Sequence, residues 1–269
     1  MSSTLDIYRR LLLLQFRSQM QYRMSFLFYI LNTALITTFE FGSLVLVMQR
    51  FENIGGWRLG EVAFLYSIVK AVFSLMDMIF SGFDPPYFGR NVRLGTFDQL
   101  LLRPVNITVQ VLGSRFELHR LGNIILGLVI FVFAMQLTDI QWTWIKLLYL
   151  PLVFLGQICF FGGLFILGST ITFWTVDSIE TVNIFTYGGS EMIAYPMHIY
   201  HQWMRLFFTF IVPAIFLNYY PALYILDKPD LFNMPPFVFF LAPIVGFISL
   251  TAASAFWRFG IKHYQSTGT

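Results

Sequence analysis

The sequence predicts an all-α membrane protein with six transmembrane helices, an N-terminal amphipathic elbow helix and a short cytoplasmic helix. First, 57% of the 269 residues are hydrophobic and 12% are charged, which is too apolar for a water-soluble domain of this size. Second, the apolar residues fall into long segments, and a helix needs roughly 20 apolar residues to cross a bilayer. Third, Lys and Arg concentrate at one set of segment ends, which is the pattern of a multi-pass protein.

The chain begins with a segment, residues 4–23, that is basic and amphipathic. Leu5, Tyr8, Leu12 and Phe16 recur at helical spacing, and the segment also contains four arginines. This pattern is typical of a helix that lies in the membrane interface. We therefore expect an elbow helix that leads into the first transmembrane helix, with the N-terminus in the cytoplasm.

Six apolar segments are long enough to cross a membrane. They are residues 24–48, 60–82, 118–137, 144–173, 202–226 and 237–259. In the fourth, Pro151 and several glycines, Gly156 among them, indicate bending or close helix packing. Residues 174–201 are too polar to cross, so we expect short interfacial helices and turns there.

Six transmembrane helices place both termini on the same side, and the basic residues decide which side that is. Twelve of the 17 Lys and Arg residues would lie with the termini and four opposite them, while Lys70 lies within a predicted transmembrane helix. We therefore expect both termini in the cytoplasm. Residues 174–201 depart from this pattern, because they would also be cytoplasmic yet contain three acidic residues and no Lys or Arg.

A basic connector, residues 90–106, separates two apolar helical hairpins. Thr96 followed by Gln99 has the spacing of a capping box, and Pro104 would end the helix. Phe97, Leu100 and Leu101 would share one face of this helix. Arg93, Asp98 and Arg103 would remain available to water or to a charged partner. The connector is thus either a cytoplasmic docking surface or an interfacial helix whose leucines rest on lipid.

Three charged residues lie inside predicted transmembrane helices, namely Glu40, Lys70 and Asp77. A bare charge at that depth costs about 2.5–3.5 kcal/mol or more, so such side chains normally face protein or water. Lys70 and Asp77 lie seven residues apart on nearly the same helix face, and Glu40 lies at a comparable depth to Lys70. They form either a structural ion pair between the first two transmembrane helices or the polar lining of a substrate path.

The sequence contains no motif for an ATPase site of its own. A P-loop needs Gly-Lys followed by Ser or Thr, and none of the four lysines follows a glycine. Cys159 is the only cysteine, which excludes an intrachain disulfide and a thiolate zinc cluster. The basic residues form no stripe for nucleic acid. We expect no catalytic residue and no metal site, although His198 and His201 with Glu191 leave open a membrane-embedded lipid-modifying enzyme.

Three stretches of the sequence resemble the type-2 ABC transporter permeases. They are GTFDQLLLRPVN at residues 95–106, GSTITFWT at residues 168–175, and YPMHIYHQWMRLFFTFIVPAIFLNYYPA at residues 195–222. More narrowly, they are similar to a subfamily that is described as uncharacterised or viologen-exporter-like. The most specific parts are a Gly-x-x-Asp-x-x-Leu-x-Arg-Pro pattern within the connector and the Tyr-Pro-Ala turn at residues 220–222.

The resemblance implies that residues 90–106 hold the coupling helix, which docks on a separate nucleotide-binding subunit. The residues that would carry ATPase coupling are Arg93, Gly95, Thr96, Phe97, Asp98, Leu100, Leu101, Arg103 and Pro104. It also implies ABC ATPase subunits that bind ATP and Mg²⁺, and a second permease that is identical or, more often, related but distinct. Both permeases would lie among the lipids of the bacterial inner membrane.

By this resemblance the complex would export a substrate from the cytoplasm. Aromatic residues make up 19% of the chain, and aromatic faces attract cations. With Glu40 and Asp77 they would suit an amphipathic, drug-like or cationic hydrophobic molecule. Export of a lipid or a glycan is the alternative within the same fold. An ion-coupled carrier that uses Glu40 and Lys70 would instead transport without ATP.

Overall fold

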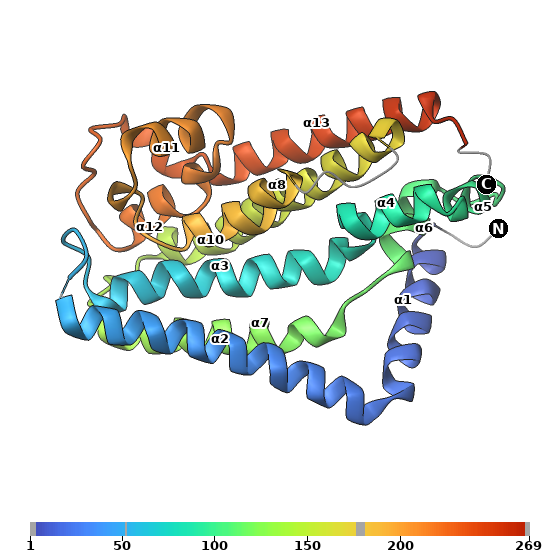
Figure 1. The fold of residues 1–269 in the computed structure, drawn as a ribbon. Coiled ribbons are helices and arrows are strands. Elements are labelled where there is room, and N and C mark those ends of the chain that lie inside the picture. Colours follow the sequence, from blue (N-terminus) through green and yellow to red (C-terminus); the bar gives the residue numbers. More distant parts are fainter. Residues whose placement is uncertain (1–3, 52, 176–180, 267–269) are drawn as a thin grey trace.

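The computed structural model of the chain describes residues 4–51, 53–175 and 181–266, and this part contains helices and loops but no β-strand. Most of the long helices lie side by side in an elongated bundle (Figure 1). Both termini and α5 lie near one another at one end of the bundle, which we call the terminal end. The other end is called the opposite end below.

The N-terminal helix α1, Thr4–Gln21, turns sharply at Tyr22 into α2, Arg23–Phe51. No side chain of α1 is buried. Two glutamines attach it to the segment that precedes α7, because Gln15 donates to the Ser114 carbonyl at 2.6 Å and Gln19 donates to the Phe116 carbonyl. The predicted amphipathic helix is therefore present and has a fixed position at the terminal end.

Four further long helices build the body of the bundle: α3, Leu59–Phe80; α7, Leu121–Leu137, which follows the short turn η2, Leu118–Arg120; α8, Trp144–Thr175; and α13, Ala242–His263. The helices α8 and α13 approach very closely. A Cβ atom on Gly246 would lie 2.1 Å from the Gly156 carbonyl oxygen. The expectation of close packing at Gly156 is thus confirmed.

Three short helices connect α3 to α7 at the terminal end. After the turn η1, Ser81–Phe83, they are α4, Pro85–Arg93; α5, Thr96–Leu101; and α6, Ile107–Ser114. The predicted basic connector therefore comprises the end of α4, all of α5 and the loop before α6. Figure 1 shows this cluster beyond the end of α3.

The segment after α8 differs from the sequence prediction. It contains α9, Thr181–Asn183; a π-helical turn η3, Ile184–Gly188; α10, Gly189–Ile193; and η4, Met197–Ile199. Tyr187 contacts Asp77, and Glu191 contacts Lys70. The segment therefore runs beside α3 in the opposite direction. Short helices and turns are present here, as the sequence predicts, but they lie beside α3 because Glu191 pairs with Lys70. Asp177 and Glu180 lie outside the described residues.

The predicted fifth transmembrane helix, residues 202–226, is instead a bent hairpin. Its first arm is α11, Gln202–Leu206, with the π-helical turn η5, Phe207–Ile211. Its second arm is η6, Ala214–Leu217, with α12, Tyr219–Ile225. The arms meet at an angle of 76°. Pro213 stands at this break, and proline cannot continue a helix because it lacks an N–H donor and its ring clashes with the preceding turn.

Both ends of this re-entrant hairpin lie at the opposite end of the bundle. His198, just before it, stacks on Trp57. Asp227 and Lys228, just after it, pair with Lys146 at the start of α8 and with Glu61 at the start of α3. The predicted fifth transmembrane helix is therefore broken into two arms, and both of its ends lie at the same end of the bundle. Arg205, assigned to the terminal side from the sequence, consequently lies at the opposite end.

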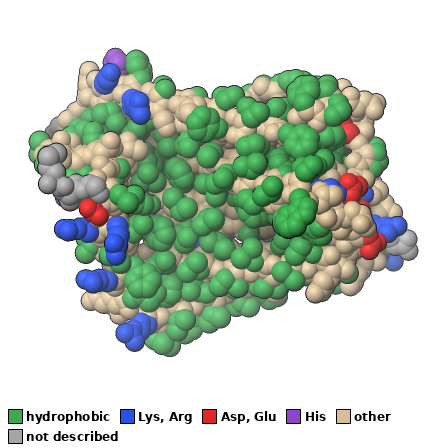
Figure 2. All heavy atoms as spheres, turned by 180° about the vertical axis from the view of Figure 1, so that it is seen from behind, with side chains coloured by type: hydrophobic (Ala, Val, Ile, Leu, Met, Phe, Trp, Pro, Cys, Tyr) green, Lys and Arg blue, Asp and Glu red, His purple; other side chains and the backbone are tan. Residues whose placement is uncertain are grey.

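Five helices in the described residues are long and apolar enough to cross a membrane, or six if the bent pair counts as one. Before α13 the chain makes one more short turn, η7, Pro236–Phe240. Seen from behind, hydrophobic side chains cover the middle of the molecule, while Lys and Arg gather at the terminal end (Figure 2). This distribution is that of a multi-pass membrane protein.

Candidate functional site

The N-terminus of α5 does not form the capping box that the sequence predicts. Gly95 precedes it with a φ of 67°, a left-handed conformation that glycine adopts without steric cost. The Thr96 hydroxyl donates to the Asn91 carbonyl at 2.9 Å instead of capping its own helix. This bond ties the start of α5 back to α4, so Gly95 sets the sharp turn between the two helices.

Phe97 does not belong to the exposed surface that the sequence predicts for α5. Its side chain is fully buried. It lies among four aromatic rings, with centroid distances of 5.4 Å to Phe88, 5.1 Å to Phe173, 6.3 Å to Trp257 and 5.0 Å to Tyr264. Phe97 therefore anchors α5 to α4, α8 and α13. The spacing of apolar residues could not reveal this, because it does not distinguish an internal face from a docking face.

The exposed apolar residues of the connector are Leu94, Leu101 and Leu102, and we call them the apolar tip. Their exposed fractions are 57%, 38% and 85%. Leu94 and Leu102 were not among the predicted coupling residues. Of the other predicted residues, Leu100 is half-buried. Besides Leu101, the exposed ones are Arg93, Thr96, Arg103 and Pro104.

The C-terminal residues and α6 brace the connector. Ser266 donates to the Asp98 carboxylate at 2.6 Å. Partial burial and the nearby Asp98 carboxylate raise the pKa of Tyr264 to about 12, so its hydroxyl stays protonated. On the other side, Gln110 donates to the Leu100 and Val105 carbonyls at 3.1 and 3.0 Å. Asp98 therefore has a partner within the chain.

A second group of functional candidates lies midway along α3. The Lys70 ammonium group lies 2.8 Å from Glu40 on α2 and 2.6 Å from Glu191 on α10. Tyr66 also donates to Glu40 at 3.1 Å. The lysine side chain is 13% exposed, but the two glutamates are 42% and 54% exposed. The cluster therefore carries one negative charge more than positive, and its acids are accessible from outside the chain.

Sequence reasoning missed Glu191 as part of this cluster. The available signal was the charge exception of residues 174–201, where acidic residues occur without Lys or Arg in a region expected to be cytoplasmic. Such an exception indicates that the acids have a partner elsewhere in the fold. Hydropathy alone could not supply that partner, because Lys70 is 121 residues away along the chain.

Asp77 does not join the Lys70 cluster, which corrects the expected grouping with Lys70 on one helix face. Its side chain is 3% exposed and lies 2.6 Å from the Arg120 guanidinium on η2. Tyr187 donates to its other oxygen at 3.4 Å. The pair joins α3 to the start of α7 and to the segment that runs beside α3. Its burial and its partners are those of a structural ion pair.

We expect Arg120→Gln to lower the free energy of unfolding by about 3–5 kcal/mol, because it leaves a buried carboxylate without its cation. The measurement is thermal unfolding of the purified protein in detergent. Arg258→Gln, which removes an exposed arginine of α13, serves as the control and should leave the midpoint unchanged. The double variant Arg120→Gln with Asp77→Asn should recover part of the lost stability, because it removes the unpaired carboxylate. An unchanged midpoint for Arg120→Gln alone would contradict a structural role of the pair.

A cavity of about 220 Å³ opens beside the Lys70 cluster, between α2, α3, α7 and α10. Glu40, Lys70 and Glu191 line it together with Arg120 and Tyr187. Thr37 and Asn123 also line it and contact each other. The cavity is thus polar over much of its wall although it lies beside the middle of long apolar helices. It is suited to water or to a charged group.

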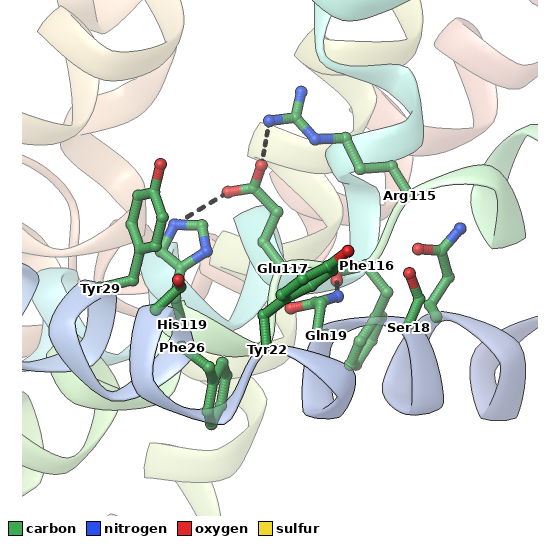
Figure 3. Close-up of a pocket in the computed structure, with 11 residues that line it drawn as sticks. Ser18, Gln19, Tyr22, Phe26, Tyr29, Arg115, Phe116, Glu117 and His119 are labelled. Atoms are coloured by element: carbon green, nitrogen blue, oxygen red, sulfur yellow. Dashed lines mark hydrogen bonds and ion pairs between the residues drawn. The ribbon is translucent and has the colours of Figure 1, made fainter.

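Another pocket, of about 330 Å³, lies where α1 turns into α2 (Figure 3). Glu117 stands at its centre and pairs with Arg115 and, at 3.2 Å, with His119. Tyr29 packs against His119 with a centroid distance of 5.6 Å. The ring contact joins α2 to the segment before α7, whereas the ion pairs lie within that segment. Glu117, the one acid among the lining residues, has basic partners, which indicates a structural junction.

His198 and Glu191, two of the three residues considered for a lipid-modifying enzyme, have separate partners in the structure. His198 stacks on Trp57 at the opposite end, with ring centroids 6.3 Å apart. Glu191 pairs with Lys70 instead. Within residues 4–51, 53–175 and 181–266, no group of three or more His, Cys, Asp or Glu side chains is arranged to hold a metal ion.

Comparison with known proteins then identifies the family. Searches of curated proteins and of solved structures returned no match. The family model described as "ABC-2 family transporter protein" matches residues 34–268, which is most of the chain. The match begins within α2 and covers the later long helices, the connector and the re-entrant hairpin. This chain belongs to the ABC-2 family of transporter membrane proteins.

Proposed function

We propose that this chain is the permease subunit of an ATP-driven exporter in the bacterial inner membrane, with both termini in the cytoplasm and the motor in a separate ABC ATPase. The observation that carries the proposal is the apolar tip, Leu94, Leu101 and Leu102, which protrudes from a braced helix at the terminal end. The sequence has no P-loop to bind ATP and Mg²⁺ itself. Family membership implies that an ABC ATPase supplies this function.

The packing of α5 supports mechanical coupling. Phe97 contacts Phe173 near the end of α8 and Trp257 on α13, so force on the connector reaches two long helices through rigid aromatic contacts. Close-packed interiors transmit displacement because they are nearly incompressible. A push on the apolar tip would therefore tilt α8 and α13, which also pack closely at Gly156 and Gly246.

We further propose that a second permease, identical or related, covers the face that carries the Lys70 cluster. Glu40 and Glu191 are 42% and 54% exposed beside the middle of long apolar helices. A carboxylate there costs about 2.5–3.5 kcal/mol if it faces lipid. A companion subunit that encloses a water-filled passage with this face removes the cost. The cavity beside Lys70 would then form part of the substrate path.

The charge of the cluster favours an amphipathic cation as substrate. Lys70 balances one of the two glutamates, so the second carboxylate remains for a positive group. Aromatic side chains near the cavity, Phe73 and Tyr187 among its lining residues, suit the apolar part of such a molecule. A lipid or glycan substrate is the alternative that transport assays would reveal.

The decisive experiment is reconstitution. The chain should copurify with a P-loop ATPase encoded beside it and with a companion permease, and vesicles that contain the complex should accumulate a cationic dye only with ATP and Mg²⁺. The purified chain alone should neither hydrolyse ATP nor turn over lipid. Uptake by vesicles of the chain alone would instead indicate an ion-coupled carrier, and lipid turnover by it would indicate an enzyme.

Glu40→Gln should reduce ATP-dependent export of a cationic substrate at least tenfold without preventing assembly of the complex. The expected loss follows from removing the surplus negative charge beside Lys70. Export by reconstituted vesicles and subunit content after purification are the measurements. Asp139→Asn, at an exposed position in the loop before α8, is the control. Full transport with a lowered unfolding temperature would show that Glu40 serves only the ion pair.

A further inference from the structure

The re-entrant hairpin encloses a cavity that has no role in the proposed substrate path. It has a volume of about 190 Å³ and lies between the two arms of the hairpin and the loop after α12. Arg205 and Phe210 contribute from the first arm, Tyr220 from the second, and Phe232 and Met234 from the loop. Its wall is thus mainly apolar, with Arg205 as the one charged side chain among the residues that line it.

The Arg205 guanidinium has no ion pair or hydrogen bond within the part of the chain that the structure describes. Its Nε atom is buried without a partner, and the group stacks on the Phe232 ring at 5.0 Å from the centroid. A guanidinium carries five N–H donors, and a buried donor without an acceptor costs about 1–3 kcal/mol. An acceptor from outside the chain would remove this cost.

The loop that forms one side of the cavity is fixed in place by its own acid. Asp230 accepts hydrogen bonds from the Phe232 and Met234 amides at 3.0 and 2.7 Å. Its carboxylate therefore holds the two lining residues in position and does not pair with Arg205. The cavity is a preformed site whose cation lacks a counter-charge at hydrogen-bonding distance.

The surroundings of the cavity are those of the membrane–water boundary. Trp203, on the same helix as Arg205, is 62% exposed, and tryptophan concentrates at the level of lipid headgroups. Leu206, Phe210 and Ile211 are exposed by 50%, 72% and 70%. The arm that carries Arg205 thus also presents a strip of apolar side chains outward.

We propose that this cavity binds the phosphate headgroup of an anionic phospholipid. Arg205 would donate two parallel hydrogen bonds to the phosphate oxygens, which its planar fork favours, while the acyl chains lie on the strip of Leu206, Phe210 and Ile211. A volume of 190 Å³ corresponds to about six waters of liquid, at roughly 30 Å³ each. This accommodates a phosphate group but leaves the acyl chains outside.

The test uses the full-length chain, delipidated in detergent, and does not depend on the proposed transport function. Phosphatidylglycerol and phosphatidylcholine with identical acyl chains are titrated, and bound lipid is counted by native mass spectrometry. We expect phosphatidylglycerol to bind at least tenfold more tightly. Arg205→Gln should abolish this preference, and Arg205→Lys should retain part of it. Arg50→Gln, an exposed arginine at the same end of the bundle, should change nothing.

Three results would overturn the proposal. The first is equal affinity of the unaltered protein for the two lipids, which requires no variant and so does not depend on folding of Arg205→Gln. The second is an unchanged preference in Arg205→Gln. The third is displacement of phosphatidylglycerol by an equal concentration of inorganic phosphate, which would assign a site for free anions instead of lipid.

Discussion

Replacing Leu102 with aspartate is expected to abolish the stimulation of the partner ATPase while leaving the permease folded. Leu102 is 85% exposed, so the change removes no packing within the chain. At the centre of a docking surface, however, it places an unpaired charge where an apolar side chain would be buried. Loss of such an anchor costs about 2 kcal/mol or more, which is roughly a 30-fold weaker complex. Leu101→Asp should act in the same direction.

The measurement is ATP hydrolysis by the purified ATPase with and without the permease in nanodiscs, together with pull-down of the two subunits. Leu102→Met keeps an apolar side chain of similar volume and should retain coupling, which separates the effect of charge from that of any substitution. If Leu101→Asp and Leu102→Asp both stimulate hydrolysis normally, the connector does not transmit force. The leucines would then serve as lipid contacts, which is the other reading that the sequence leaves open.

Phe97→Ala is expected to destabilise the whole protein by about 3–5 kcal/mol, which is typical for removal of a buried aromatic side chain from a packed core. The fully buried ring touches four other aromatic rings from α4, α8, α13 and the C-terminal segment. Its removal leaves a cavity where these elements meet. Thermal unfolding in detergent measures the change.

Leu102→Ala is the matched control, since it truncates a large apolar residue of the same connector at an exposed position. It should leave the unfolding temperature within error of the parent. If Phe97→Ala instead keeps the unfolding temperature of the parent but no longer binds the ATPase subunit, Phe97 turns outward in the complex and contacts that subunit. In that case the aromatic cluster is not the anchor of α5.

The sequence predicted the apolar helices and the position of the connector well, because both follow from local composition. The helices α2, α3, α7, α8 and α13 occupy segments that hydropathy marks as long and apolar, and the backbone of such a segment in lipid must satisfy its own hydrogen bonds. The end of α5 before Pro104 likewise agrees with the prediction, whereas its start depends on Gly95 instead of the predicted Thr96 cap. The family assignment depends on the same local motifs and is supported by the family match.

Hydropathy failed where the chain crosses the bundle without a continuous helix. Hydropathy marks residues 202–226 as a transmembrane segment and passes over residues 181–199, because residues 202–226 are the more apolar. In the fold, Pro213 bends the apolar segment into a hairpin, whereas Glu191 lies beside α3 because Lys70 supplies a charge there. A window average sums the polarity of single residues and cannot include a partner that is distant in sequence.

By itself, then, the sequence determined that this is a helical membrane protein of the ABC-2 type with a basic connector and three charged residues in its apolar segments. Only the tertiary structure decided that Phe97 faces inward, that Asp77 pairs with Arg120 and that Glu191 shares Lys70 with Glu40. It also decided that Arg205 has no acidic partner among the described residues. The reason is physical: helix formation depends on neighbours within a few residues, whereas burial and charge pairing depend on which segments meet in space.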